Sequence, residues 1–334
     1  MTSSPEKGTK PAATSYGKPG TAPLLRLYLL NGVRSAPHFL DRLKDTLATR
    51  LTGLGFDVRG RVIFPYDDWH RRLLPQVREA RFDIMLPYRR YERSIGGKRA
   101  LAVLERDRAE EGARSARHVD DERHKAIVPA NDTEEKLAVN LRAAHEEELM
   151  QSTGTAEKEP NLFVRPKELA LFVGHSAGGV AAVHASGLLL AREGGMPSPV
   201  VMIGSPKCRI PGPLRDAVLY VQAEGPQKER GAALGSRAAA PSRSEARSAG
   251  RTADPICRIG SFGGWGKKAD RLLPGWHGDR HAPGARAAVR IAGGHADYFR
   301  DRAPYIAGDG RTNMDETLAA LWPWLTERLA ERMR

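Results

Sequence analysis

The sequence is poor in cysteine, in aromatic residues and in long apolar runs. Its 334 residues contain two cysteines, Cys208 and Cys257, and aromatic residues make up 6% of the chain. Two cysteines cannot build a disulfide framework, and a single pair is typical of a reducing compartment. No stretch has the roughly 18 consecutive apolar residues of a membrane-spanning helix. We therefore expect a cytoplasmic protein without a helical membrane anchor.

Residues 1–22 also lack the apolar segment of a secretory signal peptide, although they carry lysines. We expect them to form a disordered tail. The remaining chain, 23–334, is long enough to bury the core of one enlarged α/β domain. Two polar stretches interrupt its apolar pattern, so we expect a helical and polar insertion at about 67–166 and a low-complexity insertion at about 226–253.

The formal net charge of +13 is unevenly distributed along the chain. Residues 226–290 hold thirteen Lys or Arg and five Asp or Glu, and much of this stretch is a mixture of Arg, Ala, Ser and Gly. Few aromatic residues lie between these charges, which argues against a dedicated nucleic-acid surface. We interpret the stretch as a solvated insertion, expect no nucleic-acid partner, and keep an anionic lipid surface as an alternative partner.

The first ordered part of the chain predicts a strand, a helix and a second strand. Leu24–Leu30 is almost entirely apolar, as in a strand buried on both faces of a parallel sheet. A helix should follow, with Ser35 as its N-cap and Pro37 in its first turn, because apolar residues then repeat on one helical face at Phe39, Leu43, Leu47 and Leu51. The stretch DVRGRVIFPY completes a βαβ unit, which requires a parallel sheet.

The second half continues the alternation with the strand ELALFVGH, a helix, and the strands PVVMIGSP, DAVLYVQAE and AAVRIAGG, before a closing helix at DETLAALWPWLTERLAERM. The most economical architecture is an α/β fold with a mostly parallel, doubly wound sheet and helices on both faces. In such sheets, functional residues gather at the carboxyl ends of the strands.

The residues that end the strand ELALFVGH carry the clearest chemical signal. Gly174-His175-Ser176-Ala177-Gly178 fits the pattern G-x-S-x-G between a buried strand and a helix, which is the setting of a nucleophile elbow. Its glycines suit a strained turn in which neighbouring side chains would collide. A plain glycine-rich strand-to-helix turn is the alternative interpretation. On the first interpretation, Ser176 is the nucleophile.

A serine nucleophile needs a histidine base and a carboxylate that holds this base. Among the histidines after the elbow, His295 follows a predicted strand, whereas His184 lies inside a helix and His277 and His281 lie in a loop. We therefore favour His295 as the base, with His281 and His277 as alternatives. For the acid, position at a strand end favours Glu224, and Asp254 after the low-complexity stretch is the other candidate.

The developing oxyanion needs two backbone N–H donors. In a nucleophile elbow the residue after the serine supplies one of them, which here is Ala177. The segment Asn31-Gly32-Val33 closes the first strand where the second donor is expected, and we favour the N–H of Val33 over that of Gly32. An ordinary Asn-Gly turn is the alternative.

Two other stretches have weaker signals. WHGDRH at 276–281 places two histidines around an aspartate, but no further His or Cys cluster completes a tetrahedral metal site. RSIGGKR at 93–99 lacks the spacing of a phosphate-binding loop. We expect neither a metal nor an organic cofactor.

Four motifs in succession, GHSAGG, IGSP, DPICR and GGHADYF, resemble the landmarks of the class 3 (fungal-type) triacylglycerol lipases of the α/β-hydrolase superfamily. The resemblance covers about half of the chain, at 24–66 and 165–300. It implies an α/β-hydrolase fold and a triad of Ser176, Asp254 and His295. The first strand ends in Asn-Gly-Val, where those lipases usually carry an Arg-Gly-Thr-like segment.

The resulting hypothesis is a serine carboxylester hydrolase, lipase-like or esterase-like, that cleaves a small-molecule or lipid ester through an acyl-enzyme. The alternative from another class is a non-catalytic hydrolase-fold protein whose basic insertion binds an anionic partner, either lipid headgroups or nucleic acid. Labelling of Ser176 by a fluorophosphonate would distinguish the two.

Overall fold

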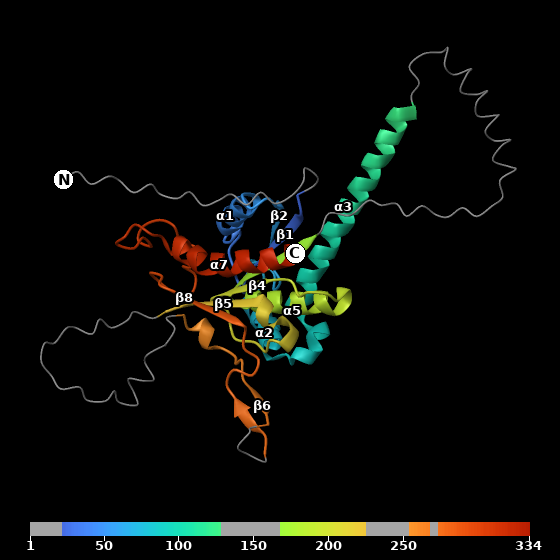
Figure 1. Cartoon of the computed structure of the whole chain (residues 1–334). Coiled ribbons are helices and arrows are strands. Elements are labelled where there is room, and N and C mark those ends of the chain that lie inside the picture. The colour runs from blue at the N-terminus through green and yellow to red at the C-terminus, as the bar shows by residue number, and fades with distance from the viewer. Residues whose placement is uncertain (1–21, 128–167, 225–253, 268–272) are drawn as a thin grey trace, which may run out of the picture. The chain divides into compact units, whose positions relative to one another are not determined.

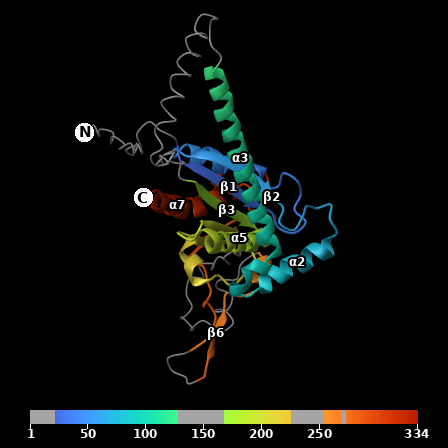
Figure 2. The ribbon, with the colours of Figure 1, turned by 90° about the vertical axis from the view of Figure 1, so that its right-hand side faces the viewer.

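Six strands form one sheet in which every neighbouring pair is parallel. The structure is a computed structural model that describes residues 22–127, 168–224, 254–267 and 273–334. The strand order is β2-β1-β3-β4-β5-β8, with β4, β5 and β8 labelled in Figure 1 and β1 beside β3 in Figure 2. The bounds are β1 Leu24–Leu30, β2 Asp57–Ile63, β3 Leu169–His175, β4 Val200–Ile203, β5 Val218–Ala223 and β8 Ala285–Val289.

The central strands are apolar because both faces of the sheet are covered. Every residue of β1 and of β3 is buried. Helices α1 (Asp41–Thr52) and α7 (Asn313–Met333) pack on one face, where they share a core cluster with alternate residues of β1, β3, β4 and β5. Helix α5 (Ala177–Glu193) packs against β3 and β4, and α2 (Leu73–Met85) packs on α5. The predicted α/β fold with a parallel sheet and flanking helices is confirmed.

Except for one long helix, the remaining elements of the described residues are shorter. They are the 3₁₀ turns η1 (Tyr88–Arg93), η2 (Gly212–Ala217) and η3 (Ile256–Arg258), helix α3 (Ile95–Ile127), and the antiparallel pair β6 (Gly264–Gly266) and β7 (Gly275–His277). The chain divides into two units, one of Met1–Ala100 with Pro166–Arg334 and one of Leu101–Arg165. Within the insertion expected at 67–166, residues up to Ala100 therefore belong to the unit that contains the sheet. The tail expected at 1–22 and the insertion expected at 226–253 lie outside the described residues, except for residue 22.

Helix α1 begins later than the sequence predicts. Its first residue is Asp41, and its N-cap position, Leu40, makes no side-chain capping bond. Ser35 does not cap the helix, because its hydroxyl donates instead to the carbonyl of Gly32 at 3.3 Å. His38 has a φ of 64°, a left-handed conformation that cannot continue a right-handed helix. The predicted apolar face is otherwise confirmed, since Leu43, Leu47 and Leu51 are buried.

The strand before His295 also lies earlier than expected. Strand β8 ends at Val289, so five residues, 290–294, separate it from His295. Its pairing with β5 accounts for this end, because the register runs from Leu219 opposite Ala285 to Ala223 opposite Val289, the last residue of each strand. His295 lies in a loop, as expected, but not directly after the strand.

None of the described helices combines the length and the apolar character that crossing a membrane requires.

Candidate active site

Ser176 occupies a sharp turn between β3 and α5. Its φ of 57° and ψ of −136° lie in a region that non-glycine residues rarely adopt. The turn is fixed from both sides, because the N–H of Ser176 donates to the carbonyl of Ile203 at 3.0 Å and the N–H of Gly179 donates to the carbonyl of Ser176 at 3.0 Å. Helix α5 then begins at Ala177. The strained backbone and the partly exposed side chain of Ser176 match the local geometry of a nucleophile elbow.

Close backbone approach explains two of the glycines around Ser176. A Cβ atom on Gly178 would collide with the carbonyl oxygen of Leu30, at the end of β1. A Cβ atom on Gly32 would lie 2.5 Å from the Cβ and 2.9 Å from the Oγ of Ser176. The segment after β1 therefore lies directly against the serine, and only glycine fits at position 32.

Asp254 is fully buried and accepts hydrogen bonds at both carboxylate oxygens. Its Oδ2 accepts from Nδ1 of His295 at 2.9 Å and from the hydroxyl of Tyr298 at 3.0 Å. Its Oδ1 accepts from the N–H of Ile256 at 2.9 Å. Burial opposes the ionisation of this carboxyl, but the bonds from His295, Ile256 and Tyr298 outweigh burial and hold the pKa of Asp254 below its usual value. Asp254 is therefore a buried carboxylate that orients the imidazole of His295.

His175 connects the histidine loop to the elbow. Its Nε2 donates to the carbonyl of His295 at 2.9 Å, and the two imidazole rings stack with centroids 4.6 Å apart. Burial, with a smaller effect of His295, lowers the pKa of His175 to about 3, so its ring is neutral at physiological pH. His295 is thus positioned next to the residue that immediately precedes Ser176. The hydrogen bonds of the described residues do not include one between Ser176 and the His295 ring.

The alternative triad residues lie in other environments. Glu224 is half exposed and pairs with Arg290 at 3.7 Å. His184 is fully buried, with Nδ1 bonded to the hydroxyl of Ser94 at 2.9 Å. His277 donates to the carbonyl of Gly266 at 3.3 Å. Among the candidates weighed from the sequence, Asp254 and His295 form the hydrogen bond between a carboxylate and an imidazole that a triad requires.

His281 lies in the loop that follows β7. Its backbone N–H donates to the carbonyl of Phe262 at 2.8 Å, and its carbonyl accepts from the N–H of Ile210 at 3.1 Å. Burial, assisted by nearby arginines, lowers the pKa of its imidazole. Among the residues that the structure describes, no group of three His, Cys, Asp or Glu side chains is arranged to hold a metal ion.

One expected oxyanion donor is adjacent to the serine in sequence, and the other follows a residue that lies against it. Ala177 follows Ser176, and Val33 follows Gly32, which touches the serine side chain. Within the described ranges, no protein group accepts a hydrogen bond from the N–H of either residue. The loop is fixed just beyond Val33, because the N–H of Arg34 donates to Oε1 of buried Gln76 at 2.8 Å.

Three polar residues of this region were not singled out from the sequence. Tyr298 bonds to Asp254 and accepts from the N–H of Ala223 at 2.8 Å, and His175 holds the carbonyl of His295. Both lie within motifs that carried the resemblance, GGHADYF and GHSAGG. Asn31 is fully buried, and its side-chain amide has no hydrogen-bond partner among the described residues. Only the position of Asn31 before Gly32 could have pointed to it.

Comparison of the chain with protein-family models, with curated proteins and with solved structures finds no match.

Proposed function

We propose that the protein is a serine carboxylester hydrolase of the α/β-hydrolase type, similar to class 3 lipases. The observation that carries the proposal is the hydrogen bond of 2.9 Å between buried Asp254 and His295. The loop that contains His295 is bonded to His175, the residue immediately before Ser176 with its strained backbone. A buried carboxylate, an imidazole and a serine in a strand-to-helix turn together favour acyl transfer through a covalent intermediate.

In the proposed reaction, the Oγ of Ser176 attacks the ester carbonyl and transfers its proton to Nε2 of His295. Asp254 holds Nδ1–H, which selects the tautomer with a free Nε2 and stabilises the imidazolium. The N–H groups of Ala177 and Val33 stabilise the oxyanion, and their lack of protein acceptors leaves them available for this role. His295 then protonates the leaving alcohol, and water hydrolyses the acyl-enzyme by the same route. The proton transfer requires a contact between His295 and Ser176 that catalytic groups often complete only when substrate is bound.

A fluorophosphonate probe tests this proposal directly, because it modifies only activated serines. We expect rapid labelling of the wild-type protein, no labelling of Ser176→Ala, and normal labelling of Ser261→Ala, which removes an exposed hydroxyl elsewhere. On p-nitrophenyl esters, Ser176→Ala should lower kcat by several orders of magnitude, while its melting temperature stays close to that of the wild type. A screen of increasing acyl-chain length then defines the substrate class.

An inert Ser176 in a folded protein would overturn the proposal. That result would favour the alternative of a hydrolase-fold binding protein. The basic stretch that this alternative invokes, at 226–253, lies outside the described residues.

A further inference from the structure

Helix α2 has an inverted distribution of polar and apolar side chains. A surface helix normally buries its apolar stripe and exposes its polar one. The buried residues of α2 are Gln76, Ala80 and Asp83. Its exposed large side chains are Leu73, Leu74, Val77, Phe82 and Met85. Exposure reaches 75% for Leu74 and 69% for Met85, so these side chains contribute almost nothing to the core of the unit that contains the sheet.

The buried polar residues fix this orientation of the helix. Both polar atoms of the Gln76 side chain are hydrogen-bonded. Its Oε1 accepts from the N–H of Arg34, and its Nε2 donates to the carbonyls of Asp68 at 2.6 Å and Arg71 at 3.1 Å. Asp83 accepts from the hydroxyl of Tyr66 at 2.9 Å and from the N–H of Ile95 at 2.9 Å. Turning α2 to bury its apolar side would leave these groups without partners, at a large cost in free energy. The outward apolar side chains are therefore a stable feature of the fold.

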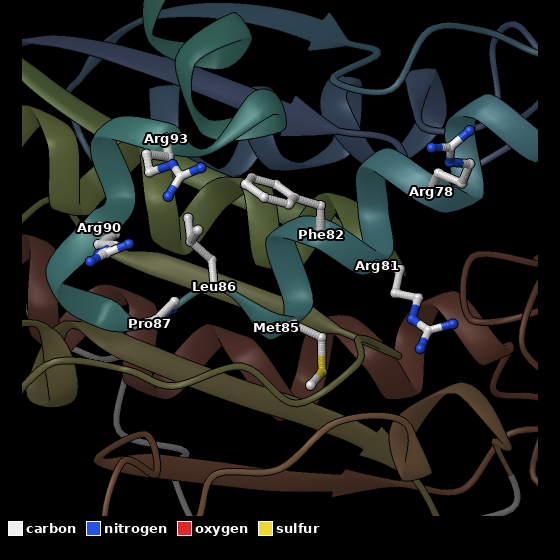
Figure 3. A pocket seen from close by; sticks show the side chains of 8 residues that line it. All are labelled: Arg78, Arg81, Phe82, Met85, Leu86, Pro87, Arg90 and Arg93. Atoms are coloured by element: carbon white, nitrogen blue, oxygen red, sulfur yellow. The ribbon is translucent and has the colours of Figure 1, made fainter.

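Arginines surround the apolar side chains at the C-terminal end of α2. A shallow cavity of about 470 Å³ is lined by Arg78, Arg81, Phe82, Met85, Leu86, Pro87, Arg90 and Arg93. Figure 3 shows Phe82, Leu86 and Arg93 close together between α2 and η1, with Arg78 and Arg81 along α2. The guanidinium of Arg93 lies 6.0 Å from the centre of the Phe82 ring. We call these eight residues, together with Leu73, Leu74 and Val77, the α2 surface.

The four arginines of the α2 surface are not paired with acidic side chains of the described residues. Glu79, which lies near Leu73 and Leu74, pairs with arginines outside this surface. No carboxylate lines the cavity, and none of the ion pairs among the described residues involves Arg78, Arg81, Arg90 or Arg93. Neighbouring arginines behave differently, since Arg71 pairs with Glu79 at 2.7 Å and Arg99 pairs with Glu79 at 3.0 Å. The α2 surface thus combines exposed apolar side chains with unpaired cations.

We propose that the α2 surface docks the protein on an anionic phospholipid bilayer. A helix that lies in the plane of a membrane places its apolar side chains among the upper acyl carbons, while its arginines reach the headgroup phosphates and carboxylates. Each arginine near an anionic leaflet strengthens binding roughly fivefold. A second copy of this chain fits less well, because a two-fold contact would bring four arginines against four others. Binding to the bilayer is independent of the proposed esterase activity.

Co-sedimentation with vesicles measures this binding without any catalytic readout. We expect the wild-type protein to bind phosphatidylcholine vesicles that contain 30% phosphatidylserine, and to bind pure phosphatidylcholine at least about tenfold more weakly. The test variant changes four arginines to glutamine, namely Arg78, Arg81, Arg90 and Arg93. The control variant has the same net charge and changes four exposed arginines elsewhere, namely Arg59, Arg61, Arg302 and Arg334.

The partition coefficient should fall at least about 50-fold in the test variant and only a few-fold in the control. A second variant, Leu74→Gln with Met85→Gln, leaves the charge unchanged and should bind about tenfold more weakly, because it removes the apolar part of the contact. Its melting temperature should not fall, since both side chains are exposed.

Three results would overturn the proposal. They are equal vesicle binding by the test and control variants, binding that is insensitive to Leu74→Gln with Met85→Gln, and binding to an acidic polypeptide such as polyglutamate with none to vesicles. The last result would assign the α2 surface to an acidic protein segment. A Ser176→Ala protein should bind vesicles like the wild type, so failure of the esterase proposal would leave this test intact.

Discussion

At the scale of single residues, the environments of Asp254 and Glu224 predict unequal effects of two similar substitutions. Asp254 is buried and bonded to His295, whereas Glu224 is half exposed and contacts Arg290. Asp254→Asn removes the acceptor that selects the His295 tautomer, so kcat on a soluble ester should fall by about 10⁴-fold. Glu224→Gln should change kcat less than about twofold.

Steady-state kinetics on p-nitrophenyl acetate distinguishes these outcomes, with circular dichroism to verify that both variants fold. A crippled Glu224→Gln protein beside an active Asp254→Asn protein would move the acid of the proposed triad to the end of β5.

Substitution of Tyr298 should change the pH dependence of the reaction. The Tyr298 hydroxyl donates to the same Asp254 oxygen that accepts the Nδ1–H of His295. Tyr298→Phe removes one donor from this oxygen, which then interacts more strongly with the Nδ1–H of His295. The acidic limb of the kcat/KM profile should therefore move to higher pH by a few tenths of a unit. The N–H of Ala223 also loses its acceptor, which should lower the free energy of unfolding by about 1–3 kcal/mol. A stability loss with an unshifted pH profile would mean that Tyr298 is only structural.

The residues of the proposed triad differ in how far the sequence alone could find them. Ser176 follows from a local pattern, because a strand, glycines and a helix are all adjacent in the chain. Position in the chain favoured His295, but the predicted end of the preceding strand was wrong, since β8 ends at Val289. Asp254 was selected over Glu224 only by resemblance. The contact of Tyr298 with Asp254 joins residues 44 positions apart, and no local pattern encodes such a contact.

At the scale of elements, one buried carboxylate connects α2 to the start of α3. Asp83, near the end of α2, accepts from the N–H groups of Ile95 and Gly96 in the first turn of α3, and from the hydroxyls of Tyr66 and Ser94. A carboxylate is favourable at this position, because the first N–H groups of a helix have no partner within the helix and carry partial positive charge.

Asp83→Asn should lower the free energy of unfolding by about 2–4 kcal/mol, because the NH₂ of the amide would face groups that are themselves hydrogen-bond donors. Urea unfolding measures the change. Glu92→Gln is the matched control, since it neutralises an exposed carboxyl in η1 and should change stability by less than about 0.5 kcal/mol. Equal stability of the two variants would mean that Asp83 does not hold α2 and α3 together.

The elements also show where sequence patterns fail. The all-apolar strands β1 and β3 were predicted because two buried faces leave a plain signal. The outward apolar side of α2 was not predicted, because its amphipathic pattern does not say which side faces the core. That choice depends on Gln76 and Asp83, whose partners Arg34, Tyr66 and Ile95 come from other parts of the chain.

At the scale of the whole molecule, two buried neutral histidines make stability depend on pH. Burial lowers the pKa of His184 to about 4 and, with a smaller effect of His295, that of His175 to about 3. Both values lie below the 6.5 of an unfolded chain, so the unfolded state binds more protons below pH 6.5. The contribution of these histidines to the free energy of unfolding is therefore fully present above pH 6.5 and is lost as the pH falls below it. Asp254 adds nothing in this window, because its carboxyl is ionised in both states above pH 5.

Each histidine should cost about 2 kcal/mol of unfolding free energy between pH 7 and pH 5. The structure explains why the pKa of His184 is lowered. Its Nδ1–H donates to Ser94, so a second proton would go to Nε2, which is buried and has no acceptor among the described residues.

Urea unfolding at both pH values measures the loss of unfolding free energy on acidification. This loss should be about 2 kcal/mol smaller in His184→Gln than in the wild type, and unchanged in His70→Gln, which alters an exposed histidine. Using the difference between two pH values within each variant cancels any stability that the substitution itself removes. If His184→Gln and His70→Gln lost equal stability on acidification, His184 would have to be protonated in the folded state, and its buried Nε2 would need a partner that the fold does not provide within the described residues.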